Sequence, residues 1–204
     1  MNRRSVHPDR DAQGKRRSIR IRGYDYARAG AYFITICTQN RALLFGEIVD
    51  GEMVLNDPGL MIARVWNELP IRFPHLELDA CVVMPNHIHG IMVLHPESVD
   101  DQKSGGDHTL GEHNTQTGEH KVRPYGTLPD TVGRVIQAFK SITTHEYVRG
   151  VKQYGWPQFK GKLWQRNYYE HVIRNDAELN RIRKYITENP AQWALDRENL
   201  RSKE

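Results

Sequence analysis

Two histidines, His87 and His89, lie one residue apart in the apolar run VVMPNHIHGIMVL at 82–94. In a β-strand, alternate side chains project from the same face about 6.5 Å apart, so both imidazoles would lie side by side. Imidazole is a common ligand of metal ions. The spacing therefore predicts two ligands of one metal ion. The alternative is a pair of buried core histidines satisfied by hydrogen bonds.

Two further candidates lie on the last predicted helix, where Tyr185 and Asn189 are four residues apart and therefore share a face. A tyrosine hydroxyl can form a covalent intermediate, but its usual pKa near 10 makes it a weak nucleophile until the electrophile is activated. A cation bound by His87 and His89 would activate a phosphodiester, and Asn189 would offer the cation an amide oxygen. Alternatively, Tyr185 borders the core and Asn189 only ends the helix.

Basic residues are concentrated in two stretches, and the arm at 1–22 carries eight of them against Asp9 and Asp11 in a chain of net charge +4. The second stretch, 134–166, interleaves cations with aromatic residues. Cations beside stacking rings suit single-stranded nucleic acid, although a solvated surface over ordinary core aromatics would have the same composition. The predicted DNA-contacting residues are Arg3, Arg4, Lys15, Arg16, Arg17, Arg20, Arg22, Lys140 and Arg166.

The order of predicted elements indicates the fold class. Apolar runs at 31–38 and 43–49 predict a hairpin or two adjacent strands. The later elements are a helix at 58–72 with Asp57 as N-cap, strands at 76–85 and 87–94, a helix from Asp130, a strand or irregular segment at 162–173, and a helix from Asn175 to Pro190. This order predicts an α+β, ferredoxin-like fold, an antiparallel sheet with its helices packed on one face.

A chain of 204 residues can form one domain with appendages. We expect a basic arm at 1–22, a catalytic domain at 23–193 interrupted by a flexible insert at 96–129, and a charged tail at 194–204. The sequence has neither an apolar run of about 20 residues nor the pattern of a signal peptide. We therefore expect a cytoplasmic protein.

Three stretches, PNHIHG at 85–90, WQRNYYEHVIR at 164–174 and YITENP at 185–190, together resemble the REP-associated tyrosine transposases, which are single-tyrosine HUH-type transposases of small insertion sequences. The resemblance spans roughly 20–193 outside the insert. It implies a ferredoxin-like fold in which His87 and His89 bind Mg²⁺ or Mn²⁺ and Asn189 is a further polar ligand. It also implies that Tyr185 attacks single-stranded DNA, leaving a 5′-phosphotyrosine and a free 3′-OH.

The implied substrate is a hairpin from a repeated palindromic element, held partly by the basic arm, by a monomer or a homodimer. A phosphotyrosine conserves the energy of the phosphodiester, and the chain has no G-x-x-x-x-G-K-[ST] loop for a nucleotide. Imidazole ligands favour Mn²⁺ over Mg²⁺, which prefers oxygen. Tyr168 and Tyr169 are rival nucleophiles by type, but we interpret them as packing or base-stacking residues, and His171 as structural.

The sequence also allows two other functions to be compared with this one. A zinc deaminase on the same histidines needs a glutamate beside the histidine and a P-C-x-x-C motif, and the sequence has neither. The second alternative, a domesticated protein that binds hairpin DNA but has no transposition activity, remains open.

Overall fold

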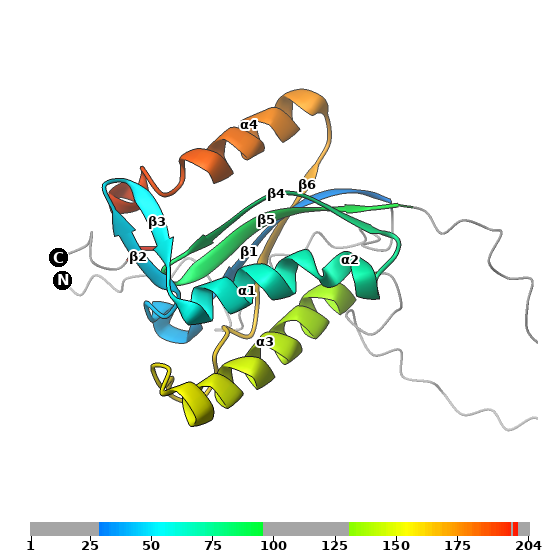
Figure 1. Ribbon diagram of the computed structural model, residues 1–204. Helices are drawn as coiled ribbons and strands as arrows, with labels where there is room; N and C mark the ends of the chain where they lie inside the picture. Colours follow the sequence, from blue (N-terminus) through cyan, green and yellow to red (C-terminus); the bar gives the residue numbers. More distant parts are fainter. Residues whose placement is uncertain (1–28, 96–130, 197, 200–204) are drawn as a thin grey trace, which may run out of the picture.

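The computed structural model describes residues 29–95, 131–196, 198 and 199. Its centre is a four-stranded sheet with the strand order β4-β5-β1-β6, in which all neighbours are antiparallel (Figure 1). The strands are β1 (Gly30–Cys37), β4 (Leu76–Met84), β5 (His87–Leu94) and β6 (Tyr169–Ile173). The predicted α+β fold with an antiparallel sheet is confirmed.

Helices cover both faces of this sheet (Figure 1). One face carries α1 (Asp57–Asn67), α2 (Leu69–Arg72) and α3 (Val132–Tyr154), and the other carries α4 (Asp176–Glu188). The prediction that all helices pack on one face is wrong. Alternate residues of β1 point to opposite faces, and Ile34 and Phe33 are both buried, so each face needs an apolar cover.

The two apolar clusters differ greatly in size. The larger one fills the space between the sheet, α1 and α3, and includes Tyr32, Trp66, Phe139 and Tyr147. The smaller one holds α4 and consists of the buried residues Phe33, Ile91, Ile173, Ile182 and Ile186. The second cluster matters for function because it fixes the helix that carries Tyr185.

Of the two alternatives predicted for the run at 43–49, a hairpin with β1 is wrong, whereas a strand is confirmed for the second half of the run. A short 3₁₀ turn, η1 (Gln39–Arg41), follows β1, and the left-handed φ angles of 56° at Asn40 and 52° at Arg41 redirect the chain. The Phe45 amide then donates to the Pro85 carbonyl at 3.1 Å. Strand β2 (Gly46–Val49) pairs instead with β3 (Glu52–Leu55) in a separate two-stranded sheet.

Asparagine side chains begin two of the helices. Asn56, one residue before the predicted Asp57, caps α1 by accepting from the Gly59 amide at 2.9 Å. Asn175 caps α4 as predicted, accepting from the Glu178 amide at 2.9 Å. In the ambiguous segment 162–173, only Tyr169–Ile173 forms a strand.

Gly90 is required by close packing on the face opposite the two histidines. A Cβ atom at this position would lie 2.3 Å from Cζ2 of Trp66, which is buried under α3. We predict that Gly90→Ala lowers the free energy of unfolding by about 2 kcal/mol, because the indole must move in a packed core. Chemical denaturation of Gly90→Ala, Trp66→Leu and the double variant measures this. Purely additive losses in the double variant would contradict the packing argument.

Among the described helices, none has the length and apolar character needed to cross a membrane. The predicted basic arm at 1–22 and the predicted insert at 96–129 lie outside the described residues.

Candidate active site

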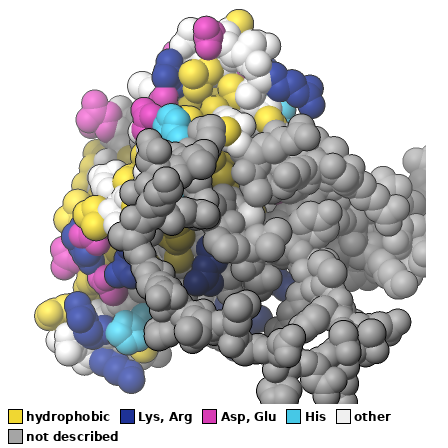
Figure 2. Space-filling model, turned by 90° about the vertical axis from the view of Figure 1, so that its right-hand side faces the viewer, with side chains coloured by type: hydrophobic (Ala, Val, Ile, Leu, Met, Phe, Trp, Pro, Cys, Tyr) yellow, Lys and Arg dark blue, Asp and Glu magenta, His cyan; other side chains and the backbone are white. Residues whose placement is uncertain are grey.

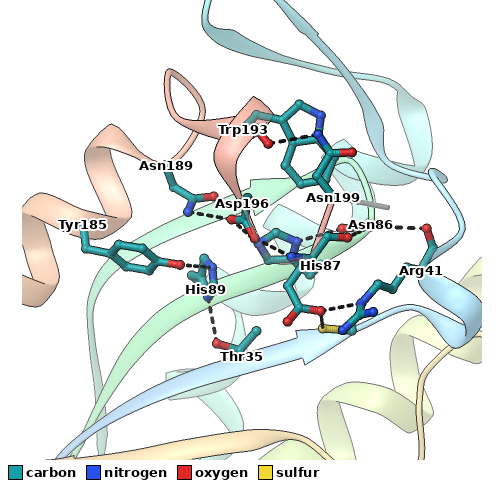
Figure 3. Close-up of polar contacts among 12 residues, drawn as sticks. Thr35, Arg41, Asn86, His87, His89, Tyr185, Asn189, Trp193, Asp196 and Asn199 are labelled. Atoms are coloured by element: carbon teal, nitrogen blue, oxygen red, sulfur yellow. Dashed lines mark hydrogen bonds and ion pairs between the residues drawn. The ribbon is translucent and has the colours of Figure 1, made fainter. Parts of the chain in front are cut away.

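The paired histidines lie on the face of the sheet that α4 covers (Figure 3). In the register of β5 and β1, His87 is opposite Cys37 and His89 is opposite Thr35. The two imidazole centroids are 4.4 Å apart, and both side chains are buried. The predicted strand therefore places both imidazoles on one face.

Asn86 fixes the tautomer of His87. The Asn86 Nδ2 donates to the carbonyls of Arg41 at 3.2 Å and Glu198 at 2.9 Å, so its Oδ1 must be the atom that lies 2.8 Å from His87 Nδ1. An amide oxygen only accepts, so Nδ1 of His87 carries the proton. The lone pair of His87 is therefore on Nε2, which is buried and has no hydrogen-bond partner among the described residues.

His89 connects the sheet to the tyrosine. Its Nδ1 lies 2.8 Å from the Thr35 hydroxyl, and its Nε2 lies 3.2 Å from the Tyr185 hydroxyl. Burial, followed by the neighbouring His87, lowers the pKa of His89 to about 3. Burial, followed by the charge of Arg41, also lowers the pKa of His87 to about 3. Both imidazoles are therefore neutral at pH 7, the form that ligates metals.

Tyr185 projects from α4 toward His89 (Figure 3). Its ring packs edge-on against Phe33 at a centroid distance of 6.0 Å, and the residue is 40% exposed. The helix is fixed on the sheet by the smaller apolar cluster and by Arg183, whose Nε donates to Asp79 of β4 at 2.9 Å. The hydroxyl is thus held at the donor atoms while its ring remains open to solvent on one side.

Asp196 completes the donor set, and sequence reasoning missed it. The chain turns after α4 through the 3₁₀ segment η3 (Trp193–Leu195) and returns a buried carboxylate to the histidines. Oδ2 of Asp196 lies 4.0 Å from His87 Nε2. The sequence places this residue in the charged tail, because an aspartate in a polar stretch has no spacing that relates it to strand β5.

Asn189 ends α4 and lies beside Asp196, to which its Nδ2 donates at 2.9 Å. Since a carboxylate only accepts, this bond fixes the amide and leaves Oδ1 of Asn189 buried without a partner among the described residues. Its predicted role as a metal ligand stays a prediction, and the orphaned oxygen is consistent with it.

A divalent cation fits these residues. Ligand atoms of His87, His89 and Asp196 all lie within 4.8 Å of one another. Two ligands that each lie about 2.1 Å from one ion are about 3 to 4 Å apart, so only a small contraction is needed. The orphaned Nε2 of His87 is an acceptor that a cation would satisfy. The group can therefore bind a metal ion.

We predict that Asp196→Asn weakens Mn²⁺ binding about 10- to 100-fold, because a neutral amide replaces the only carboxylate among the three grouped ligands. The electron paramagnetic resonance signal of free Mn²⁺ gives the affinity directly. Glu188→Gln, on an exposed part of α4, is the matched control. Equal Mn²⁺ affinity in Asp196→Asn and the native protein would exclude Asp196 as a ligand.

Lys140 was predicted to contact DNA, and the structure gives its ammonium group bonds within the protein. Nζ donates to the carbonyls of Gln165 at 2.9 Å and Asn167 at 3.1 Å, with a longer contact to that of Arg166 at 3.4 Å. Burial lowers the pKa of Lys140 to about 8. Lys140 therefore holds segment 165–167 in place, and any contact with DNA would compete with these bonds.

The remaining predicted residues lie around the site or beyond the described chain. His171 Nε2 lies 2.8 Å from a Glu178 carboxylate oxygen, as expected for a structural histidine. Tyr169 is 43% exposed on β6, and Arg166 is exposed. The predicted arm residues lie outside the described residues: Arg3, Arg4, Lys15, Arg16, Arg17, Arg20 and Arg22.

The chain is similar to two proteins of Haemophilus influenzae. An uncharacterized protein of Haemophilus influenzae is 36% identical over 184 residues, which cover 89% of this chain and 91% of that protein. A second Haemophilus influenzae protein, described as a candidate REP-associated tyrosine transposase, is 24% identical over 82% of this chain and 74% of its own length. No protein-family model matches the chain.

A solved structure of a REP-associated tyrosine transposase bound to a REP hairpin has a TM-score of 0.51 and 20% sequence identity, and the match covers 85% of this chain and 73% of that one. This similarity shows a common fold. The chain therefore belongs to the family of the first Haemophilus influenzae protein. It shares its fold with a REP-associated tyrosine transposase, and its sequence is distantly similar to those of such proteins.

Proposed function

We propose that this protein is a metal-dependent enzyme that cleaves and rejoins single-stranded DNA next to a hairpin through a 5′-phosphotyrosine intermediate. The observation that carries this proposal is the Tyr185 hydroxyl, which lies 3.2 Å from Nε2 of His89 within the buried group of His87, His89 and Asp196. A nucleophile and a set of metal ligands are thus within contact distance of one another.

Each residue has a definite part in this chemistry. Mg²⁺ or Mn²⁺ bound by His87, His89 and Asp196, with Asn189 beside them, would neutralise charge on the oxygens of the phosphodiester. The Tyr185 oxygen forms the new bond to phosphorus and loses its proton to solvent water, to which the residue is 40% exposed. The bond to the 3′ oxygen breaks, and that oxygen takes up a proton to become a free 3′-OH.

The bond energy is conserved in this exchange. One phosphoester bond replaces another, so the 3′-OH of a second strand can attack the phosphotyrosine and restore a phosphodiester without a nucleotide cofactor. While the phosphotyrosine exists, the contact with Phe33 and the smaller apolar cluster keep Tyr185 beside the predicted metal ligands.

Hairpin DNA is the substrate class that the comparisons support, since the solved relative is bound to a REP hairpin. On the face shown in Figure 2, basic and acidic side chains of the described residues are interspersed among apolar ones. The basic arm at 1–22, with eight basic residues against two aspartates, is the part of the sequence that we propose to bind phosphates.

The test is a cleavage assay with labelled oligonucleotides that carry a palindromic hairpin and unpaired flanks. With Mn²⁺, a 3′ label should appear on a covalent protein–DNA band, and a 5′ label on a shorter strand that a DNA polymerase can extend. A chelator should abolish both products. Tight hairpin binding without either product in Mn²⁺ or Mg²⁺ would instead identify a hairpin-binding protein without transposition activity.

Deleting residues 1–18 should weaken hairpin binding and flatten its dependence on salt. This segment contains six of the eight basic residues of the arm, and each phosphate contact that is lost lowers the slope of log K against log salt by about 0.7 to 0.9. Fluorescence anisotropy at several salt concentrations measures the slope. An unchanged slope in the truncated protein would show that the arm does not bind phosphates.

A further inference from the structure

A cavity of about 390 Å³ is lined by Tyr185 and by His89, whose Nε2 lies 3.2 Å from the Tyr185 hydroxyl. Its floor is strand β1, with Phe33, Thr35 and Cys37. His89 and Tyr185 line one side. The other side is formed by segment 165–169, which belongs to the stretch WQRNYYEHVIR and has no role in the chemistry described above.

The register of the sheet relates this cavity to the nucleophile. Tyr169 of β6, Thr35 of β1 and His89 of β5 are directly opposite one another across three neighbouring strands. Neighbouring strands are about 4.8 Å apart, so Tyr169 lies about 10 Å across the sheet from the histidine. The space between them begins at the reacting group and extends away from it along the sheet.

Aromatic rings line the cavity. Phe33 lies between two tyrosines and meets each edge-on, with centroid distances of 6.2 Å to Tyr169 and 6.0 Å to Tyr185. Phe33 is 9% exposed, whereas Tyr169 is 43% exposed. A half-exposed ring supported by a buried one is a rigid surface on which a planar base can stack.

Amide groups line the same side as Tyr169. Gln165 donates its Nε2 to the Thr38 carbonyl at 3.1 Å, and its backbone amide donates to the Cys37 carbonyl at 3.0 Å. Asn167 is exposed and also lines the cavity. Carboxamides can both donate to and accept from the edge of a base.

The wall that carries these groups is fixed from behind. Lys140 of α3 donates to the carbonyls of residues 165, 166 and 167, and its ammonium lies 5.5 Å from the centroid of the Tyr168 ring. An irregular segment held at three consecutive carbonyls keeps its shape when no ligand is present. A binding site formed in advance loses less entropy on binding.

We propose that this cavity binds the unpaired base of a nucleotide that flanks the scissile phosphate. The base stacks on Tyr169, and the carboxamides of Gln165 and Asn167 contact its edge. This inference rests on the proposed function, because the nucleotide belongs to the strand that Tyr185 cleaves. It assigns the segment around Asn167 and Tyr169 to recognition of the DNA immediately at the break.

The decisive experiment combines abasic substitutions in the DNA with protein variants, and measures binding with a chelator present so that cleavage is not required. The three unpaired nucleotides on each side of the cleavage point are made abasic one at a time. If no cleavage point is found, the three unpaired nucleotides on each side of the hairpin foot are used. In the native protein, one position should weaken binding about 5- to 20-fold, as expected for a lost stacking contact. In Tyr169→Leu, that same abasic site should cause no further loss.

Two variants control for the fold. Tyr169→Phe keeps the ring and should regain the abasic-site effect that Tyr169→Leu loses, whereas Tyr154→Leu removes an exposed tyrosine at the far end of α3 and should change nothing. The proposal would be overturned if, at every position, the abasic substitution lowers the affinity of Tyr169→Leu as much as that of the native protein. Failure of the protein to cleave any DNA would count against the proposed function, while the binding cycle would still decide on the pocket.

Base preference gives a second measurement. Asn167→Ala should reduce the differences in affinity among the four bases at the sensitive position and leave the affinity for the abasic strand unchanged. An unchanged order and spread of the four affinities would show that Asn167 does not contact the base edge.

Discussion

Tyr185→Phe removes the covalent protein–DNA adduct and leaves hairpin binding within about two-fold of the native protein. We expect this result because the substitution deletes only the hydroxyl, while the ring keeps its edge-on contact with Phe33 and its place on α4. The hydroxyl is the sole atom of this residue that can bond to phosphorus, so adduct formation should fall at least about 1,000-fold. Denaturing gel electrophoresis of 3′-labelled DNA with Mn²⁺ measures the adduct.

Two neighbouring tyrosines provide the matched controls. Tyr168→Phe and Tyr169→Phe remove hydroxyls from residues that also line the cavity, whereas the hydroxyl that lies 3.2 Å from Nε2 of His89 is that of Tyr185. Both variants should form the adduct at nearly the native rate. If the adduct persists in Tyr185→Phe and is lost in one of the two controls, the tyrosine substituted in that control is the nucleophile.

His87→Ala should reduce Mn²⁺ affinity more than 100-fold and abolish cleavage, while hairpin affinity changes little. The variant removes the Nε2 lone pair of His87, which is buried and has no hydrogen-bond partner among the described residues. It also leaves Oδ1 of Asn86 without its donor, so some loss of thermal stability is expected as well. An Mn²⁺ titration monitored by electron paramagnetic resonance below the melting temperature measures the metal affinity of the folded variant, and so separates lost metal binding from lost stability.

His171→Ala is the control for His87→Ala. His171 projects from the same face of the sheet, opposite Phe33, but its ring pairs with Glu178 and lies outside the group of metal ligands. Its removal should lower stability without altering Mn²⁺ affinity. If His87→Ala binds Mn²⁺ as well as His171→Ala does, the paired histidines are structural.

Local sequence patterns predict much of this fold and part of the site. The alternation in VVMPNHIHGIMVL is enough to place His87 and His89 on one face of a strand, because side-chain direction in a strand depends only on position. The start of α4 follows equally from local chemistry, since Asn175 caps a helix whose end is enforced by Pro190. The separation of the helices onto two faces does not follow from such patterns.

The rest of the site depends on contacts between distant residues. Asp196 reaches the histidines only because η3 turns the chain back after α4, and no periodicity relates it to His87, more than 100 residues earlier. Lys140 shows the opposite case. Its type and its aromatic neighbours suggested a DNA contact, but three carbonyls of segment 165–167 occupy its ammonium group. Residue type alone does not reveal which partner a cation has.

Because the cluster beneath α4 is small, the stability of this helix on the sheet differs from the stability of the whole fold. Five buried side chains attach this helix, whereas the larger cluster joins the sheet to α1 and α3. Detachment of α4 should therefore cost less free energy than global unfolding, and its amide hydrogens should exchange with solvent earlier than those of α3. The fraction of molecules able to react at any instant is then set by the docking equilibrium of a single helix, which substitutions in the larger cluster would leave almost unchanged.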